Sequence, residues 1–224
     1  MRVVECRSPN FDARDRAVDM LVLHYTGMKT GAEALARLCD PAAKVSAHYT
    51  IDRDGRIYAH VPEELRAWHA GVSYWAGEKN VNGRSIGIEI VNPGHEFGYV
   101  PFADVQIAAL IDLADGIVQR HKIPANRVLG HSDVAPARKQ DPGELFPWKC
   151  LSEYELGVWP NGKTAALDEP FEKALSRFGY GVAPDVDVPL KDVIAAFQRH
   201  FRPSCVDGIA DAESQALLGA LLAA

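Results

Sequence analysis

The stretch Gly130-His131-Ser132-Asp133-Val134-Ala135-Pro136-Ala137-Arg138-Lys139-Gln140-Asp141-Pro142-Gly143 is the part of the sequence around which the rest of the chain is organised. It holds one imidazole, two carboxylates and two cations, and it follows the apolar pair Val128-Leu129. Its prolines and glycines restrict the path of a loop, and such a loop holds polar groups rather than burying itself. Taken alone, the stretch also fits an ordinary solvated loop. Two other segments of the chain decide whether it is a functional loop.

Two further apolar runs each carry a polar group that a protein core does not favour. Met20–Thr26 brings His24 to the end of a predicted strand, and Ser85–Asn92 has Glu89 in its middle. A histidine at the end of a buried strand is often a core residue whose ring nitrogens are hydrogen-bonded. A buried carboxylate, however, needs a partner, a metal ion or a raised pKa. Together with the run that leads to His131, three predicted strands therefore each bring a polar group that is unusual in a protein core.

Five motifs occur in a fixed order along residues 15 to 150: LVLHYT, SAHYTIDRDGRIY, AWHAG, NVNGRSIGIEIVN and LGHSDVAPARKQDPG. In this combination the chain resembles the zinc-dependent N-acetylmuramoyl-L-alanine amidases of the AmpD/AmiD type. That superfamily also includes phage amidases and peptidoglycan-recognition proteins. The resemblance implies an α/β fold with a mixed central β-sheet flanked by helices. It also implies one zinc ion per chain, with His24, His131 and Asp141 as its ligands.

The implied ligand set suits a catalytic metal site. Two imidazoles and one carboxylate leave the fourth position of a tetrahedral zinc open for water. Because only one ligand is anionic, the site keeps a net positive charge and can acidify bound water toward a pKa of about 7. Asp133 is closer in sequence to His131 and could in principle be the third ligand. The resemblance favours Asp141, so we expect Asp133 to brace the loop.

The resemblance also implies a reaction and a catalytic pair. We expect hydrolysis of the amide between the lactyl group of N-acetylmuramic acid and L-alanine, in peptidoglycan or in anhydromuropeptides. Glu89 is expected to carry the proton from water to the departing amine, and Lys139 to stabilise the oxyanion together with zinc. The alternative is a non-catalytic peptidoglycan-recognition module, although such members typically lack a zinc ligand.

Residues 62–84 contain few periodic apolar positions but several aromatic and amide side chains. Such a segment can form the wall of a binding groove, or it can be a long surface excursion pinned by two tryptophans. We predict that the substrate contacts four residues: His48, Trp68, His69 and Asn82. For His48, a role as a satisfied core histidine is equally open. Four other histidines are expected to be structural or to lie at the surface: His60, His95, His121 and His200.

The composition of the 224 residues, 47% apolar and 24% charged, is that of a soluble globular protein. The net charge of −6 and the lack of a basic block argue against nucleic acid as a partner. The longest apolar runs are too short to cross a bilayer. Because the first ten residues lack a signal-peptide pattern, we expect a cytoplasmic protein. The alternatives are a protein of the cell envelope or periplasm, or a lysin released by a prophage. We expect a monomer.

The four cysteines Cys6, Cys39, Cys150 and Cys205 are scattered without CxxC spacing. That pattern argues against a cysteine zinc site and against a dense disulfide framework. Reduced thiols in the cytosol are the simplest interpretation, although one pair could still meet in space.

Local patterns predict several elements. Thr30 and the Ala/Leu-rich residues up to Leu38 predict a short capped helix. Arg53-Asp54-Gly55 between two alternating runs predicts a β-hairpin. Apolar residues at helical spacing in Phe102–His121 predict an amphipathic helix. The polar residues 7–17 are expected to form a surface lead-in rather than a core element.

We predict an amidase domain over residues 1–156, a linker over 157–167 and a small all-α domain over 168–224. The linker is rich in glycine, proline and small residues, and three amphipathic segments follow it. These segments resemble, more weakly than the amidase motifs, the helical peptidoglycan-binding domain often attached to such enzymes. The alternative is a helical cap that only buries apolar surface of the first domain.

Overall fold

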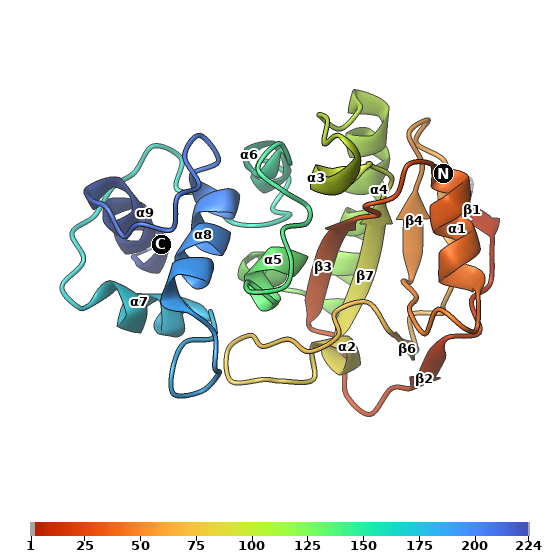
Figure 1. The fold of residues 1–224 in the computed structure, drawn as a ribbon, viewed down its shortest axis with the longest axis horizontal. Coiled ribbons are helices and arrows are strands. Elements are labelled where there is room, and N and C mark those ends of the chain that lie inside the picture. Colours follow the sequence, from red (N-terminus) through yellow and green to blue (C-terminus); the bar gives the residue numbers. More distant parts are fainter. Residues whose placement is uncertain (1–2, 224) are drawn as a thin grey trace.

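The two apolar runs that carry His24 and Glu89 form the longest strands of the central sheet in the described chain. β3 (Met20–Tyr25) and β7 (Ser85–Ile90) pair in parallel, with His24 directly opposite Glu89. Their Ile, Leu and Val residues suit strands that are buried on both faces. The computed structural model, which describes residues 3–223, places both strands inside a six-stranded sheet (Figure 1).

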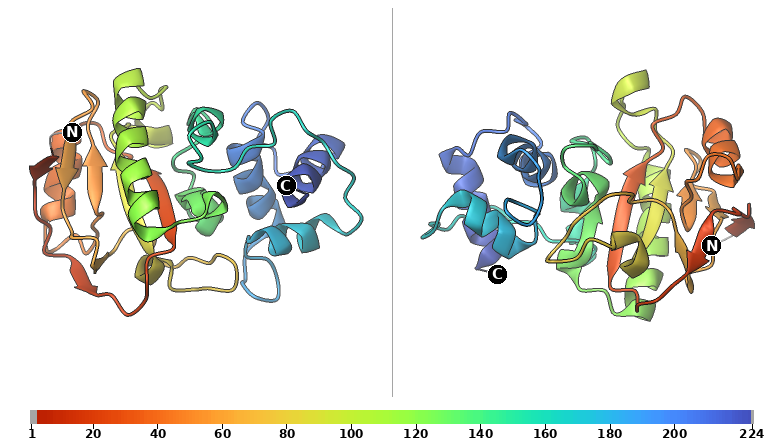
Figure 2. Two further views of the ribbon diagram at one scale, coloured as in Figure 1. Left: turned by 180° about the vertical axis from the view of Figure 1, so that it is seen from behind. Right: turned by 60° about the horizontal axis from the view of Figure 1, so that its bottom comes forward.

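The sheet has the strand order β1-β5-β4-β7-β3-β8, and its pairs are parallel except for β4 with β5. Helices lie on both of its faces (Figures 1 and 2). The mixed sheet flanked by helices that the sequence predicts is therefore confirmed. The four shorter strands are β1 (Val3–Glu5), β4 (Tyr49–Ile51), β5 (Ile57–Ala59) and β8 (Val128–Gly130).

The antiparallel pair β4 and β5 is the predicted hairpin. Ile51 lies opposite Ile57, and the N–H of Gly55 donates to the carbonyl of Asp52 at 2.9 Å. Gly55 has φ +79°, a left-handed conformation that glycine adopts without steric cost. The Asp-Gly pair thus supplies the turn that the sequence pattern indicates.

One face of the sheet is covered by α4 (Asp104–His121), which confirms the predicted amphipathic helix. The helix lies along this face of the sheet (Figure 2), and its apolar side belongs to one buried cluster with leucine and isoleucine residues of β3 and β7. Fully burying one such aliphatic side chain contributes about 1.5–3 kcal/mol. The helix contributes five buried residues to this core: Ile107, Leu110, Leu113, Ala114 and Ile117.

The opposite face carries α1 (Gly31–Cys39) and the candidate site. The hydroxyl of Thr30 accepts from the backbone N–H of Glu33 at 3.2 Å, so the predicted cap and helix are confirmed. Four one-turn helices and one 3₁₀ turn complete this part of the chain: α2 (Val81–Arg84), α3 (Gly94–Phe97), η1 (Ala125–Arg127), α5 (His131–Val134) and α6 (Trp148–Ser152).

The N-terminal segment contains more regular structure than the sequence predicts. β2 (Phe11–Ala13) pairs antiparallel with β6 (Leu65–Ala67) in a separate two-stranded sheet, and β1 forms an edge of the main sheet. Three-residue strands show too few alternating positions to stand out in a polar sequence. The predicted surface lead-in is confirmed only in part, because Phe11 and Ala13 are exposed whereas Ser8 and Asn10 are buried.

Three helices form the C-terminal part, as predicted: α7 (Phe171–Phe178), α8 (Leu190–Phe201) and α9 (Ala212–Leu222). Within the described residues, no helix or strand lies between α6 and α7. The apolar residues of these helices join one buried cluster with Met20, Val22 and Leu129 of the sheet. The second sheet face and the C-terminal helices thus share a core, while the division into two domains stays a prediction. None of the helices described is long and apolar enough to cross a membrane.

Candidate metal centre and active-site cleft

Strand alternation turns His24 and Glu89 toward the same side of the sheet. Successive side chains of a strand point to opposite faces. In β3, Leu21 and Leu23 belong to the core under α4, whereas Met20 and Val22 belong to the core on the other side. His24 continues the second series, away from α4. Glu89 lies beside it in register and follows Ile88, which belongs to the α4 core.

His131 and Asp141 reach the same place through the loop after β8. Gly130 ends β8 opposite Leu23, so the next residue, His131, leaves the sheet one position from His24. The loop then folds back, and the N–H of Ser132 donates to the carbonyl of Asp141 at 2.8 Å. Residues that are 117 positions apart in the sequence therefore come into contact.

Three ligand atoms of metal-binding type face one another at this point. Nδ1 of His24 lies 2.9 Å from Nδ1 of His131, and Oδ2 of Asp141 lies 3.0 Å from each of them. All three side chains are buried. The donor atoms of a tetrahedral zinc ion with bonds of about 2.0–2.1 Å lie about 3.3 Å apart. The three atoms therefore fit around one small cation.

The tautomer of His24 follows from a chain of hydrogen bonds behind it. The hydroxyl of Ser85 donates to the carbonyl of Val81 at 2.7 Å, so its oxygen accepts from Nε2 of His69 at 3.1 Å. Nδ1 of His69 then carries no proton and accepts from Nε2 of His24 at 3.0 Å. This leaves Nδ1 of His24 with a free lone pair that points to the centre.

The tautomer of His131 is fixed in the same way. Its Nε2 donates to the carbonyl of Ala70 at 3.1 Å, so its Nδ1 also presents a lone pair to the centre. Oδ1 of Asn82 accepts from the backbone N–H groups of His69 and Ala70, at 3.1 and 2.7 Å, and so holds that carbonyl in place. Partners of this kind orient the ligands of metal sites. Two lone pairs 2.9 Å apart repel each other unless a cation lies between them.

The protonation state of His24 also suits a cation. Burial lowers the pKa of His24 to about 4, with His131 beside it acting in the same direction, so the imidazole is neutral at pH 7. A neutral imidazole is the form that binds a metal ion.

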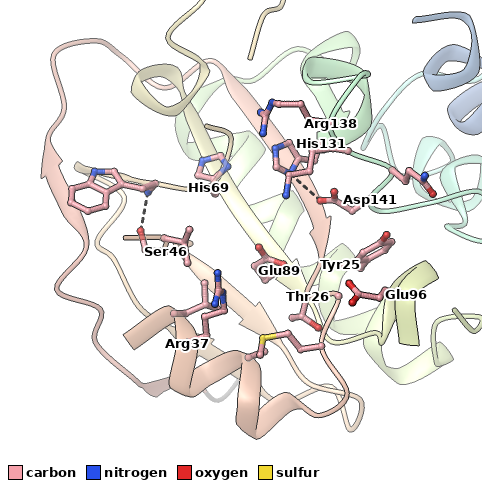
Figure 3. Close-up of a pocket in the computed structure, with 18 of the residues that line it drawn as sticks. Tyr25, Thr26, Arg37, Ser46, His69, Glu89, Glu96, His131, Arg138 and Asp141 are labelled. Atoms are coloured by element: carbon pink, nitrogen blue, oxygen red, sulfur yellow. Dashed lines mark hydrogen bonds and ion pairs between the residues drawn. The ribbon is translucent and has the colours of Figure 1, made fainter. Parts of the chain in front are cut away.

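A cavity of about 450 Å³ opens at the centre and contains Glu89 (Figure 3). Burial raises the pKa of Glu89 well above its usual value, the charge of Asp141 adds to this, and Lys139 acts against it. Within the described residues, Oε2 of Glu89 is buried and has no hydrogen-bond partner. An unpaired buried carboxylate oxygen is costly, so its place in the cavity suits a group that handles protons.

Two of the four predicted substrate contacts line this cavity. Trp68 does so from the end of β6, with Nε1 donating to Oδ2 of Asp12 at 2.6 Å. His69 also lines the cavity, with both ring nitrogens bonded as described. In the described chain, His48 and Asn82 are not among the lining residues. All four assignments stay predictions.

His48 is fully buried beneath the cavity wall. Its Nδ1 accepts from the N–H of Gly87 at 2.9 Å, and its Nε2 donates to the carbonyl of Leu65 at 3.1 Å. Nη2 of Arg14 lies 3.1 Å from the same Nε2. Burial lowers the pKa of His48 to about 3, with the charge of Arg14 acting in the same direction, so the side chain is neutral at pH 7.

This burial predicts a pH dependence of stability. The unfolded chain takes up a proton at His48 below pH ~6.5, whereas the folded chain does so only near pH 3, so acid favours unfolding in that window. His48→Asn cannot take up this proton. The difference in free energy of unfolding between parent and variant should therefore shrink by about 2 kcal/mol from pH 7 to pH 5. Urea unfolding of metal-free protein measures it, and a difference that does not change with pH would contradict a neutral buried His48.

Tyr180 and His200 support the site through Asp133, although the sequence analysis assigned neither of them to it. Oδ2 of Asp133 accepts from the N–H of Gly130 at 2.7 Å and from Nδ1 of His200 at 2.8 Å. Oδ1 accepts from the hydroxyl of Tyr180 at 2.6 Å. Asp133 thus ties the loop of His131 to the C-terminal helices instead of joining the metal group. No local pattern marks Tyr180 or His200, because their partner lies 47 and 67 residues away.

Arg138 anchors the second half of the loop that follows β8 and carries His131 and Asp141. Its Nη2 donates to the carbonyls of Ala70, at 3.0 Å, and of Val72. The guanidinium therefore closes the cavity beside His131, whose Nε2 uses the same carbonyl of Ala70 (Figure 3).

Comparison with known proteins agrees with this geometry. The model of the N-acetylmuramoyl-L-alanine amidase family, Amidase_2, matches residues 14–144, which is more than half of the chain. The N-acetylmuramoyl-L-alanine amidase AmiD of Escherichia coli K12 is 39% identical, and the match covers 98% of this chain and 90% of AmiD. The 1,6-anhydro-N-acetylmuramyl-L-alanine amidase AmpD of Haemophilus influenzae is 35% identical over 66% of this chain and 90% of AmpD.

Solved structures show the same relationship. The complex of AmiD from Escherichia coli with anhydro-N-acetylmuramic acid-L-Ala-D-γ-Glu-L-Lys superposes with a TM-score of 0.81 at 38% identity, covering 95% of this chain and 92% of that chain. AmpDh3 from Pseudomonas aeruginosa, in complex with anhydromuramic pentapeptide, gives a TM-score of 0.82 at 37% identity, covering 92% and 91%. The chain therefore belongs to the family of N-acetylmuramoyl-L-alanine amidases.

Proposed function

We propose that this amidase uses one zinc ion to hydrolyse the amide between the lactyl group of N-acetylmuramic acid and L-alanine. The observation that carries the proposal is the convergence of His24, His131 and Asp141 within 3.0 Å of one another, at the end of a cavity that also holds Glu89. Two free imidazole lone pairs and a carboxylate oxygen form a site with three protein ligands. Zinc enzymes with an open coordination position use such a site.

The three ligand residues would hold the ion through Nδ1, Nδ1 and Oδ2. When bound, zinc supplies a Lewis acid that polarises the scissile carbonyl and lowers the pKa of water to about 7. His69 and Ala70 would keep the imidazoles oriented, because they engage the Nε2 atoms of His24 and His131.

Glu89 would move the proton. Its carboxylate takes a proton from the attacking water and passes it to the amine of L-alanine as the amide bond breaks, so the amine leaves neutral. A positioned base of this kind contributes about 10²–10⁴-fold in rate. Lys139 lines the same cavity and lowers the pKa of Glu89, which supports a position close to the reacting groups. Its ammonium would stabilise the negative charge that develops on the carbonyl oxygen.

The substrate class is supported by cations in the cavity and by the relatives. Among the described residues, Arg37, Arg138 and Lys139 line the cavity together with three acidic residues, Glu89, Glu96 and Asp141. The three cations offer partners for the carboxylates of a stem peptide. The AmiD and AmpDh3 structures contain anhydromuramic peptides, which supports soluble anhydromuropeptides as substrates of this chain. Peptidoglycan of the intact wall offers the same bond.

Metal removal should abolish the reaction. We expect dialysis against a chelator to remove one zinc per chain and all amidase activity, and one equivalent of zinc to restore both. Asp141→Ala should lower zinc affinity more than about 100-fold, because even changes behind the ligands cost about 10–100-fold. His95→Gln is the matched control, since its ring lines the cavity outside the metal group and should leave zinc content unchanged. Metal analysis and product masses measure both outcomes.

The same assay separates the alternative functions. A non-catalytic recognition module would bind muropeptides but release no free stem peptide, with or without zinc. Digestion of purified sacculi and of soluble anhydromuropeptides side by side then distinguishes wall lysis from recycling. The cytoplasmic location and the monomeric state stay predictions, which cell fractionation and light scattering test.

A further inference from the structure

A second trio of metal-ligand type lies away from the catalytic centre and consists of Cys6, Cys39 and His60. Cys6 follows β1, and Cys39 is the last residue of α1. Their Sγ atoms are 3.2 Å apart although the residues are 33 positions apart in sequence. Both side chains are half-buried, so a small reagent can reach them.

The backbones of both cysteines are fixed by hydrogen bonds that do not involve sulfur. The N–H of Cys6 donates to the carbonyl of Ala59 at 2.9 Å. On the other side of the contact, the hydroxyl of Ser8 donates to the carbonyl of Leu38 at 2.5 Å, and Nδ2 of Asn10 donates to the carbonyl of Asp40 at 2.8 Å. The residues flanking Cys39 are thus tied to the segment that follows Cys6. These backbone contacts hold the two thiols together in addition to the hydrogen bonds of the Cys39 sulfur with Cys6.

Hydrogen-bond direction argues against a metal ion at this trio. Nδ1 of His60 lies 2.6 Å from the carbonyl oxygen of Cys6, which can only accept, so Nδ1 carries the proton. Nε2 accepts from the hydroxyl of Thr50 at 2.8 Å. Neither ring nitrogen has a lone pair free for a metal. The candidate metal centre differs in this respect, because Nδ1 of His24 and Nδ1 of His131 both present a lone pair to the space between the three ligand residues.

We propose that Cys6 and Cys39 are a disulfide site, which closes when the protein meets a disulfide oxidant such as oxidised glutathione. The thiolate of Cys6 attacks the oxidant, and one thiol leaves as a mixed disulfide forms. Cys39 then attacks Sγ of Cys6, and the second thiol leaves. The two cysteines lose two electrons and two protons in all, and the oxidant gains them as two thiols.

The order of these steps follows from the surroundings of Cys39. Burial, together with the neighbouring Cys6, raises the pKa of Cys39 to about 12, so it is a poor first nucleophile at neutral pH. Reaction of Cys6 removes part of that effect. Closing the bond needs an approach of only about 1 Å between the sulfur atoms.

The cross-link would join the edge of the sheet to one wall of the cavity. The segment between the two cysteines contains β3 with His24, and α1 contributes Ala34, Arg37 and Leu38 to the cavity lining. Closing this long loop restricts the unfolded chain much more than the folded one. Oxidation should therefore raise the melting temperature, by about 5–10 °C for a loop and a chain of this size.

The test uses the full chain, incubated in oxidised or in reduced glutathione. We expect oxidation to yield a Cys6–Cys39 cross-linked peptide in non-reducing digests and to raise the melting temperature, with reductant reversing both. The double variant Cys150→Ser/Cys205→Ser is the matched control and should behave like the parent. Cys6→Ser and Cys39→Ser should show no difference between the oxidised and reduced samples, whatever their own stability.

Three results would overturn the proposal. The first is a parent protein in which Cys6 and Cys39 both remain open to alkylation after oxidation. The second is a set of cross-linked peptides that contain Cys150 or Cys205 instead. The third is a second zinc equivalent that protects the two thiols and disappears in Cys39→Ser, which would make the trio a metal site. None of these readouts depends on amidase activity, so they are independent of the proposed function.

Discussion

Glu89→Gln is expected to lose nearly all turnover while keeping both its zinc and its fold. The amide cannot accept a proton from water at neutral pH, so the rate should fall by about 10²–10⁴-fold or more. The metal ligands are untouched, since the three atoms that converge come from His24, His131 and Asp141. Turnover of an anhydromuropeptide and metal content per chain measure the two effects separately.

The same substitution should not destabilise the protein. Oε2 of Glu89 is buried without a partner within the described residues, and burial raises the pKa of the carboxyl group well above its usual value. A neutral amide of the same shape avoids that desolvation, so the melting temperature of metal-free Glu89→Gln should equal or exceed that of the parent. Such a gain in protein stability on loss of activity is typical of catalytic groups whose burial costs folding free energy.

Glu96→Gln provides the control, because Glu96 lines the same cavity but is exposed. It should change the rate only slightly. Near-native turnover of Glu89→Gln or of Glu89→Ala would remove Glu89 from the mechanism. Loss of zinc together with turnover would instead make Glu89 part of the metal site.

The largest effect on stability is expected for Asp133→Ala. The change leaves three buried donors without their acceptor: the N–H of Gly130, the hydroxyl of Tyr180 and Nδ1 of His200. Each unsatisfied buried group costs about 1–3 kcal/mol. The sum, about 3–5 kcal/mol after partial relaxation, corresponds to a fall in melting temperature of about 10 °C or more. Thermal and urea unfolding measure it.

Two further variants sharpen this prediction. Tyr180→Phe removes one donor only, so its cost should be about 1–3 kcal/mol. Asp185→Asn is the matched control, because Asp185 accepts from the hydroxyl of Tyr74 across the same two parts of the chain, but at an exposed position. Its effect should stay within about 0.5 kcal/mol. A cost for Asp133→Ala no larger than that of the control would show that the buried contacts do not hold the two parts together.

Much of the fold could be predicted because its longer elements have strong local patterns. The helical stripe of α4, the Thr30 cap of α1 and the Asp-Gly turn between β4 and β5 each follow from a few neighbouring residues. The three-residue strands β1, β2 and β6 could not be predicted, because their pairing partners, and not their own sequences, make them strands.

The candidate site shows the same contrast. Resemblance to a family predicts His24, His131 and Asp141, and the structure brings these three together. Sequence reasoning could not predict the hydrogen-bond partners that hold these residues and their loop in place. Hydrogen bonds such as those from Tyr180 and His200 to Asp133 join residues far apart in the chain, so no spacing or periodicity announces them. The same holds for the contact between Cys6 and Cys39.

The core that the sheet shares with α7, α8 and α9 limits how this enzyme can be re-engineered by exchange of parts. His200 stacks on Trp148 with ring centroids 3.8 Å apart while it donates to Asp133, so one side chain of α8 serves packing and loop geometry together. A foreign module grafted after residue 167 would have to restore both functions. Chimeras that keep Tyr180 and His200 should therefore retain zinc and amidase activity. Chimeras that replace these two residues should lose amidase activity, whatever binding specificity the new module has.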